Sequence, residues 1–204
     1  MKTRMKVLLS VLISLAITGI AYAGISGSKH DLTQGPGMTS TVIVGMCEYC
    51  HTPHNANTDT APLWNHDMTG LVPASFTMYA SGTLNGAIDA APAGVSMVCF
   101  SCHDGATALE DFGGVTTGPT KINTNANLGT NLANDHPISI TYDAVSDTGL
   151  HATTSAFGTI TIANVLYGGK VECASCHDVH DDTNAPFLRL NNNTSGLCLA
   201  CHNK

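Results

Sequence analysis

The chain has 204 residues, with eight basic and fifteen acidic side chains and a formal net charge of −7. This acidic balance disfavours nucleic acid as a partner, and the length allows one domain or two small ones. Phe, Trp and Tyr make up only 5% of the residues, so the polypeptide alone offers a thin core that another component has to fill.

The first 23 residues have the features of a secretory signal peptide. Lys2, Arg4 and Lys6 form a basic start, residues 7–20 are an apolar run that is short for a membrane span, and residues 21–23 read A-x-A. An uncleaved anchor is the alternative. We expect a mature chain of residues 24–204 without a membrane span, exported to the periplasm, the cell surface or the extracellular space. Its five basic and fifteen acidic residues give a net charge of about −10.

All eight cysteines fall into C-x-x-C pairs, and a histidine directly follows each pair. Two cysteines three positions apart project from one side of a helical turn, with the next residue beside them. Both thiols can then bond to the vinyl groups of one haem while the imidazole binds its iron. The sequence predicts four covalently bound haem c groups, at Cys47-x-x-Cys50-His51, Cys99-x-x-Cys102-His103, Cys173-x-x-Cys176-His177 and Cys198-x-x-Cys201-His202.

Three other interpretations of the cysteines fit less well. A thioredoxin-like redox pair would occur once, within alternating strands and helices. A disulfide framework explains an even number of cysteines in an exported chain, but not the same spacing four times with His each time. Structural zinc uses C-x-x-C pairs, yet it does not require His directly after every pair.

Two of the motifs are extended to C-x-x-C-H-x-x-H, at residues 47–54 and 173–180, and a plain C-x-x-C-H follows each. We therefore expect one tetrahaem domain with two di-haem units, at roughly 47–103 and 173–202. The added His54 and His180 project from the same side as the preceding motif histidine, so they cannot easily reach the far face of their own haem. We expect each to bind the iron of a neighbouring haem, the alternative being a surface role.

The other histidines are further candidates for the sixth iron ligand. His136 precedes a short alternating stretch and is favoured as a ligand, whereas His66 and His151 are reserves. His30 lies on an N-terminal arm before Gln34-Gly35-Pro36-Gly37, and it can complete a haem in its own chain, complete one in a neighbouring chain, or lie in a disordered tail. No methionine recurs at a fixed offset from the motifs, so His is preferred at all four irons.

Regular secondary structure is expected to be sparse. Short helices should carry the attachment motifs, and strands are expected near Ile138–Tyr142 and Thr159–Cys173, the second as a hairpin turning at Gly168-Gly169. The expected fold class is a multihaem cytochrome c, mostly irregular coil with short helices and a few short strands packed around four haems.

With these motifs in place, the chain resembles the multihaem cytochromes that metal-reducing bacteria secrete to the cell surface, especially the tetrahaem type that polymerises into nanowire filaments. The resemblance implies a continuous chain of haems with two histidines on each iron, and a ligand from one subunit completing a haem of the next. It points to His30, His54, His136 and His180 as the distal ligands. The matching segments are Ser28–Leu32, Cys47–Asn55, Ala61–Asn65, Cys99–Gly105, Asn134–Ile138, Val171–His180 and Cys198–Lys204.

Two classes of function follow from the sequence. An electron carrier is the first, because irons with both axial positions filled change oxidation state but bind no substrate. It would act as a filament subunit or as a soluble periplasmic shuttle, with other redox proteins or extracellular acceptors as partners. A haem enzyme such as a reductase or peroxidase is the second, and it requires one iron with an open position. All four motifs keep their histidine and six more are present, so we expect no enzyme.

Overall fold

The structure is a computed structural model that describes residues 24–34, 45–57 and 63–203. The expected signal peptide lies outside these ranges, as do Gly35-Pro36-Gly37. Within them no helix is long and apolar enough to cross a membrane.

Most of the described chain is coil and turn, as expected. The three α-helices within the described residues are short: α2 at Gly94–His103, α3 at Cys173–Cys176 and α4 at Gly196–Cys201. Four single 3₁₀ turns lie at Leu32–Gln34, Pro73–Ser75, Ile162–Val165 and Asn193–Ser195, and the strands are β1 (Ile140–Thr141), β2 (Ala156–Phe157), β3 (Ile160–Thr161) and β4 (Lys170–Val171).

The strands form two separate antiparallel pairs. β1 pairs with β4, with Ile140 opposite Val171, and β2 pairs with β3 across a two-residue turn that begins at Gly158, whose φ of 63° suits a tight hairpin. The strand expected near Ile138–Tyr142 is therefore present but only two residues long.

The hairpin expected at Thr159–Cys173 is only partly formed. The turn at Gly168-Gly169 is present, and Tyr167 and Lys170 exchange both backbone hydrogen bonds across it. The first arm, however, is broken by the 3₁₀ turn Ile162–Val165. The side chain of Asn164 accepts the N–H and the hydroxyl of Thr161, and this local bond favours a turn over an extended strand.

Three of the four attachment motifs lie on helices, as expected. Cys99 and Cys102 are on α2, and the last two motifs form α3 and α4. The expectation of a helix was wrong for the first motif, which is a turn closed by the hydrogen bond from His51 N–H to the Cys47 carbonyl. One closed turn satisfies the geometry of attachment, so no longer helix is required there.

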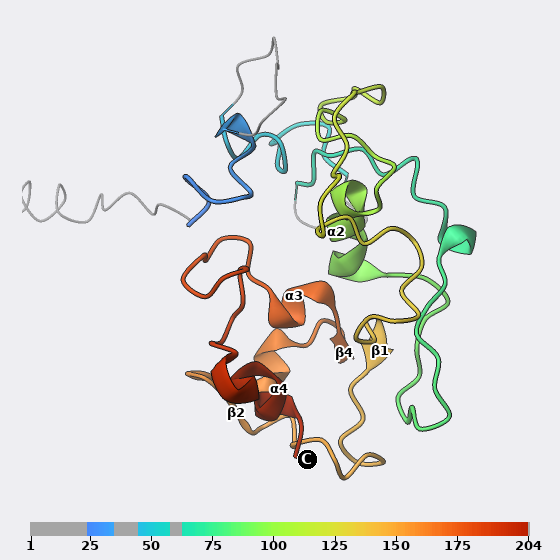
Figure 1. The fold of residues 1–204 in the computed structure, drawn as a ribbon, viewed down its shortest axis with the longest axis vertical. Helices are drawn as coiled ribbons and strands as arrows, with labels where there is room; N and C mark the ends of the chain where they lie inside the picture. The colour runs from blue at the N-terminus through green and yellow to red at the C-terminus, as the bar shows by residue number, and fades with distance from the viewer. Residues whose placement is uncertain (1–23, 35–44, 58–62, 204) are drawn as a thin grey trace, which may run out of the picture.

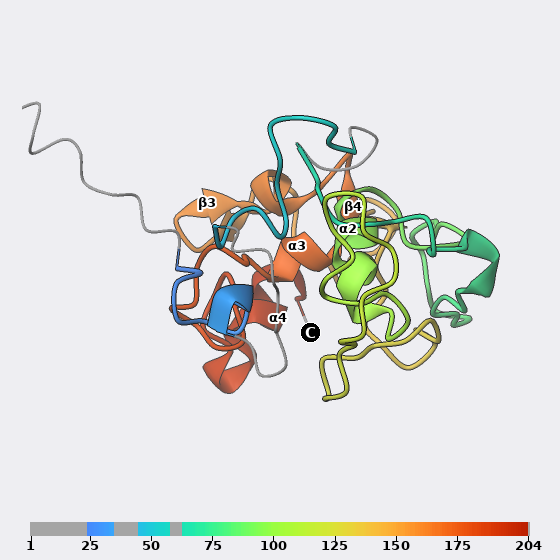
Figure 2. The ribbon, with the colours of Figure 1, turned by 90° about the horizontal axis from the view of Figure 1, so that it is seen from above.

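The core consists of two small clusters rather than one. Leu71, Phe76, Phe100 and Leu132 pack around α2, and Tyr142, Phe157, Ile162 and Val165 pack beside α3 and α4. Figure 1 shows the first half of the chain at one end of the molecule and the second half at the other, with α2 and α3 where they meet. Figure 2 shows α2 and α3 side by side from a second direction.

Because each cluster is small, the stability of the cluster around α2 should be sensitive to single substitutions. Phe100 is 1% exposed and stacks edge-on against Phe76, with ring centres 5.1 Å apart. We expect Phe100→Ala to lower the free energy of unfolding by about 3–5 kcal/mol, because it removes a fully buried ring and leaves a cavity. Val145→Ala, at a side chain that is 92% exposed, is the control and should stay within about 0.5 kcal/mol of the parent. Equal thermal melting shifts for the two variants would contradict this packing.

Candidate haem-binding site

The same backbone hydrogen bond closes the attachment motifs. In the third and fourth motifs the histidine N–H donates to the carbonyl of the first cysteine, over 3.0 Å in His177 and 2.9 Å in His202. In both, the helix ends at the second cysteine and the histidine has extended backbone angles. The turn therefore presents two sulfurs together and releases the imidazole beside them, which is the arrangement that covalent haem attachment needs.

The second cysteine of every motif is held as a neutral thiol. Burial raises the pKa of Cys50 and Cys176 to about 11, and it raises that of Cys102 and Cys201 as well. A reactive redox cysteine or a zinc ligand works as a thiolate, which a lowered pKa favours. The raised pKa at these four positions disfavours both of those roles.

Three pairs of histidines face each other across similar gaps. The ring centres are 6.2 Å apart in His30–His103, 6.3 Å in His51–His180 and 6.2 Å in His136–His202. In each pair one member belongs to an attachment motif and the other is one of the remaining histidines. Three of the four distal candidates, all but His54, are therefore placed opposite a motif histidine of the same chain.

These separations fit one metal ion between two imidazoles. A metal–imidazole bond is about 2 Å long, so two imidazoles on opposite sides of one ion have ring centres about 6 Å apart. A haem supplies the remaining ligands of its iron, and two such imidazoles complete it. In the described part of the chain, no group of three or more His, Cys, Asp or Glu side chains lies close enough to hold a metal ion by itself.

Several of these imidazoles are also oriented through Nδ1. The Nδ1 of His103 lies 2.6 Å from the Ala126 carbonyl, that of His177 lies 3.0 Å from the Pro186 carbonyl, and that of His136 lies 3.0 Å from the Pro137 carbonyl. A carbonyl at Nδ1 places the ring proton there and leaves Nε2 available to a metal. The ring nitrogens are therefore arranged as metal-binding histidines require.

Asp178 lies beside His180 and holds its backbone. Its Oδ1 accepts the His180 backbone N–H and lies 3.7 Å from His180 Nδ1, while its Oδ2 is 3.0 Å from Arg189 Nη1. Asp178 was not among the residues predicted from the sequence, although it lies between the two histidines of the C-x-x-C-H-x-x-H motif. A carboxylate one residue after a motif histidine is the signal that would have found it.

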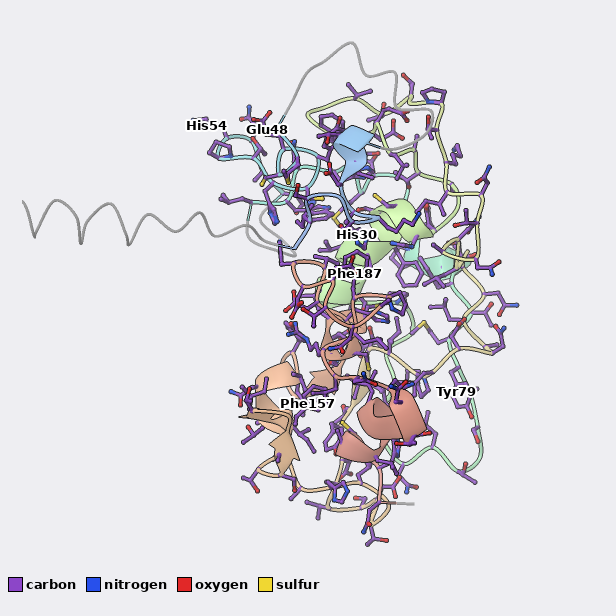
Figure 3. All side chains as sticks on the ribbon, turned by 60° about the vertical axis from the view of Figure 1, so that its left-hand side comes forward. His30, Glu48, His54, Tyr79, Phe157 and Phe187 are labelled. Atoms are coloured by element: carbon purple, nitrogen blue, oxygen red, sulfur yellow. The ribbon has the colours of Figure 1, made fainter. Side chains whose placement is uncertain are left out.

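His30 is half-buried and packs against the C-terminal half of the molecule. Its ring is 4.5 Å from that of Phe187, and Figure 3 shows the two side chains next to each other. Burial, together with the neighbouring His103 and His177, lowers the pKa of His30 to about 4. The imidazole thus stays neutral, the form that binds iron. Of the possibilities left open by the sequence, a ligand for a haem of its own chain is the one that this contact favours.

The remaining histidines have other surroundings. We find no ring pair of this kind for His177 among the described residues, and its side chain is exposed. His54 is exposed at the edge of the molecule (Figure 3), and His151 is half-buried. His66 is buried, with Nε2 3.3 Å from the Cys102 sulfur.

The cysteines of successive motifs lie near each other. The neighbouring thiol of Cys50 contributes to the raised pKa of Cys102, and that of Cys201 contributes to the raised pKa of Cys176. The thiols of Cys99 and Cys173, in the second and third motifs, are in direct contact. This contact and burial raise the pKa of Cys99. The four attachment positions therefore follow one another in space in the order of the sequence.

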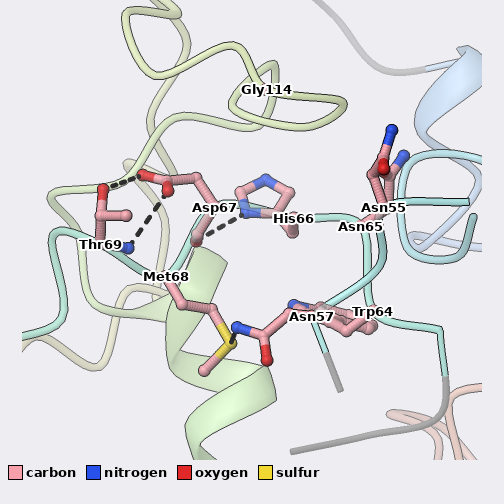
Figure 4. A pocket seen from close by; sticks show the side chains of 9 residues that line it. All are labelled: Asn55, Asn57, Trp64, Asn65, His66, Asp67, Met68, Thr69 and Gly114. Carbon is pink, nitrogen blue, oxygen red and sulfur yellow. Dashed lines mark hydrogen bonds between the residues drawn. The ribbon is translucent and has the colours of Figure 1, made fainter. Parts of the chain in front are cut away.

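A cavity of about 310 Å³ adjoins the first two motifs. Trp64, His66, Asp67 and Met68 are among its lining residues (Figure 4), and the Trp64 ring meets that of His51 edge-on, with centres 5.8 Å apart. Trp64 Nε1 and His30 Nδ1 are buried without a hydrogen-bond partner among the described atoms. Buried polar groups normally have a hydrogen-bond partner. A polar group of a cofactor bound beside the paired histidines would supply one to both atoms.

Comparison with known families gives a match at the C-terminal end. The family described as "Doubled CXXCH motif" matches residues 167–204, which contain the third and fourth motifs. No curated protein matches the chain. The paired motif indicates covalently bound haem c and a multihaem, c-type cytochrome-like protein, and it favours an electron carrier over an enzyme.

A single histidine substitution tests the ring pairs. His136→Ala removes the imidazole opposite His202, so one iron should lose its sixth ligand and give a high-spin ferric signal from about a quarter of the haem in electron paramagnetic resonance. His151→Ala is the control, since this ring has no facing motif histidine among the described contacts, and it should keep the parent spectrum. A low-spin spectrum for His136→Ala identical to the parent would exclude the His136–His202 pair.

Proposed function

We propose that the protein transfers electrons through four covalently bound c-type haems with two histidines on each iron. The observation that carries this proposal is the set of three facing histidine pairs at 6.2–6.3 Å, each containing one motif histidine. A haem supplies the one-electron chemistry, and the chain supplies the thiols and imidazoles that attach and orient it. Two imidazoles per iron leave no position for a substrate and favour a low reduction potential.

The order of the cysteines supports a conduit rather than four isolated centres. Cys50 lies by Cys102, Cys99 contacts Cys173, and Cys176 lies by Cys201. Haems attached at these positions are neighbours in the order first, second, third and fourth. An electron entering at the first motif would leave at the fourth.

The third haem requires a ligand that the facing pairs do not supply. His177 is exposed, and its Nδ1 lies 3.0 Å from the Pro186 carbonyl, which leaves Nε2 available to a metal. We assign its partner to the exposed His54 of a second copy of the chain. A contact between two different surfaces of identical subunits is heterologous, and it produces a filament where successive copies do not close into a ring. The exported chain would then act at the cell surface or outside the cell, passing electrons to redox proteins or extracellular acceptors.

The exposed His177, which has no facing histidine among the described residues, also supports two alternative functions. A soluble periplasmic shuttle would complete the third haem from within, for instance with His151. A multihaem reductase would leave this iron open for a substrate. The spin state of monomeric and assembled protein separates the three possibilities.

Haem content tests the proposal most directly. We expect pyridine haemochrome quantitation on purified protein to give four haems per chain, and the mass of the intact protein to exceed that of the processed polypeptide by four haem groups. Acid and solvent extraction should leave the haem on the protein, because thioether bonds hold it. A mass equal to that of the bare chain would end the proposal.

His54→Ala tests the contact between subunits. We expect the parent protein to form filaments in electron micrographs with all haem low-spin, and His54→Ala to stay monomeric with about a quarter of its ferric haem high-spin. His151→Ala is the matched control and should polymerise. Filaments of His54→Ala with only low-spin haem would exclude His54, and an all-low-spin monomer of the parent would favour the shuttle.

A further inference from the structure

A buried carboxylate lies where the two halves of the molecule meet. Glu172 directly precedes the third attachment motif and is 3% exposed. Its Oε2 accepts hydrogen bonds from the hydroxyls of Ser96 and Ser139, the latter over 2.9 Å. Such a group is costly to bury, and it is retained here with two donors on one oxygen.

These bonds join three segments that are far apart in the sequence. Ser96 is in the first turn of α2, and its hydroxyl oxygen also accepts the Cys173 backbone N–H over 2.9 Å. Ser139 precedes β1, and its hydroxyl oxygen accepts the N–H of Ala93, just before α2. Glu172 therefore fixes α2 against α3, the elements that carry the second and third attachment motifs.

The carboxylate lies beside the cysteines of both motifs. Ser96 and Cys99 are three positions apart on α2 and so project from one face of it, and Cys99 contacts Cys173, the residue after Glu172. The fourth and first motifs have no corresponding bond to Glu172 among the described residues. Its charge would therefore act unequally on the four haems.

The other charges near Glu172 neutralise each other. Lys170 on β4 binds Asp89, with 2.6 Å between Nζ and Oδ2, and this ion pair contributes no net charge. Burial raises the pKa of Glu172 above its ordinary value, and the hydrogen bonds from Ser96 and Ser139 and the charge of Lys170 oppose that rise. Both serine hydroxyls donate to Oε2, which is the arrangement that stabilises the ionised carboxylate.

We propose that Glu172 is a positioning residue that sets a fixed negative charge between the second and third haems and holds their reduction potentials below those of the first and fourth. A nearby anion stabilises the ferric form, which carries one more positive charge than the ferrous form. The inference rests on the proposed haem attachment. It makes the two central haems the less easily reduced pair, so that electrons cross a shallow barrier between the two ends of the chain.

Glu172→Gln tests the charge, because the amide keeps the size of the side chain and an oxygen acceptor. We expect four haems per chain and a rise in two of the four potentials, equivalent to about a tenfold change in the electron-exchange equilibrium with the other two haems, or 59 mV for a one-electron couple. Asp143→Asn removes an exposed charge and is the control, which should leave the four potentials unchanged. Glu172→Asp keeps the charge, so the reduction potentials of the second and third haems should stay below those of the first and fourth.

The outcomes separate this inference from the proposed function. Fewer than four haems in the parent protein would refute the haem assignment itself. Four haems with unchanged potentials in Glu172→Gln would leave that assignment intact and overturn the role of Glu172. If Glu172→Gln does not accumulate, the parent protein decides the question. Nuclear magnetic resonance can assign the haem methyl signals during a redox titration and so give the reduction potential of each haem. If the two haems with the lowest potentials are not the second and third, the inference is overturned.

Discussion

Each C-x-x-C-H segment has to present two sulfurs and one imidazole to the same side of a single turn, and the rest of the chain is arranged around that requirement. One bond from the histidine N–H to the carbonyl of the first cysteine closes the turn, whether it is a free turn, as at His51, or the end of a helix, as at His177. A longer element would add nothing to this geometry. The described chain is mostly coil, and its strands are two residues long.

What the sequence could predict is what short segments determine by themselves. The four attachment motifs, a short helix at three of them and the turn at Gly168-Gly169 depend on residues a few positions apart. The first arm of the expected hairpin did not form, and the cause is an equally local interaction. The bond between Thr161 and Asn164 is as local as the alternation that suggested a strand, and it competes directly with the extended backbone.

The pairing of distal histidines could not be predicted, because it joins segments distant in the sequence. His54 and His180 occupy the same place in the same extended motif, yet only His180 faces a motif histidine, His51. The difference lies in their surroundings. Asp178 and Arg189 hold the loop of His180, whereas the bonds of the His54 backbone within the described residues are to the nearby Thr52, in an exposed loop. Position in a motif makes a ligand possible, and tertiary contacts decide which haem it reaches.

The position of His54 has a consequence for how subunits would be connected. It lies three residues after His51, so an His54 that completes the third haem of one copy brings the first haem of its own copy to the same contact. The third and fourth attachment positions are neighbours through Cys176 and Cys201. The first haem of one subunit would therefore arrive beside the last haems of the other. The His54 imidazole would then both join the subunits of the filament and bring their haems together for electron transfer. A subunit contact made elsewhere on the surface would join the subunits without bringing their haems together.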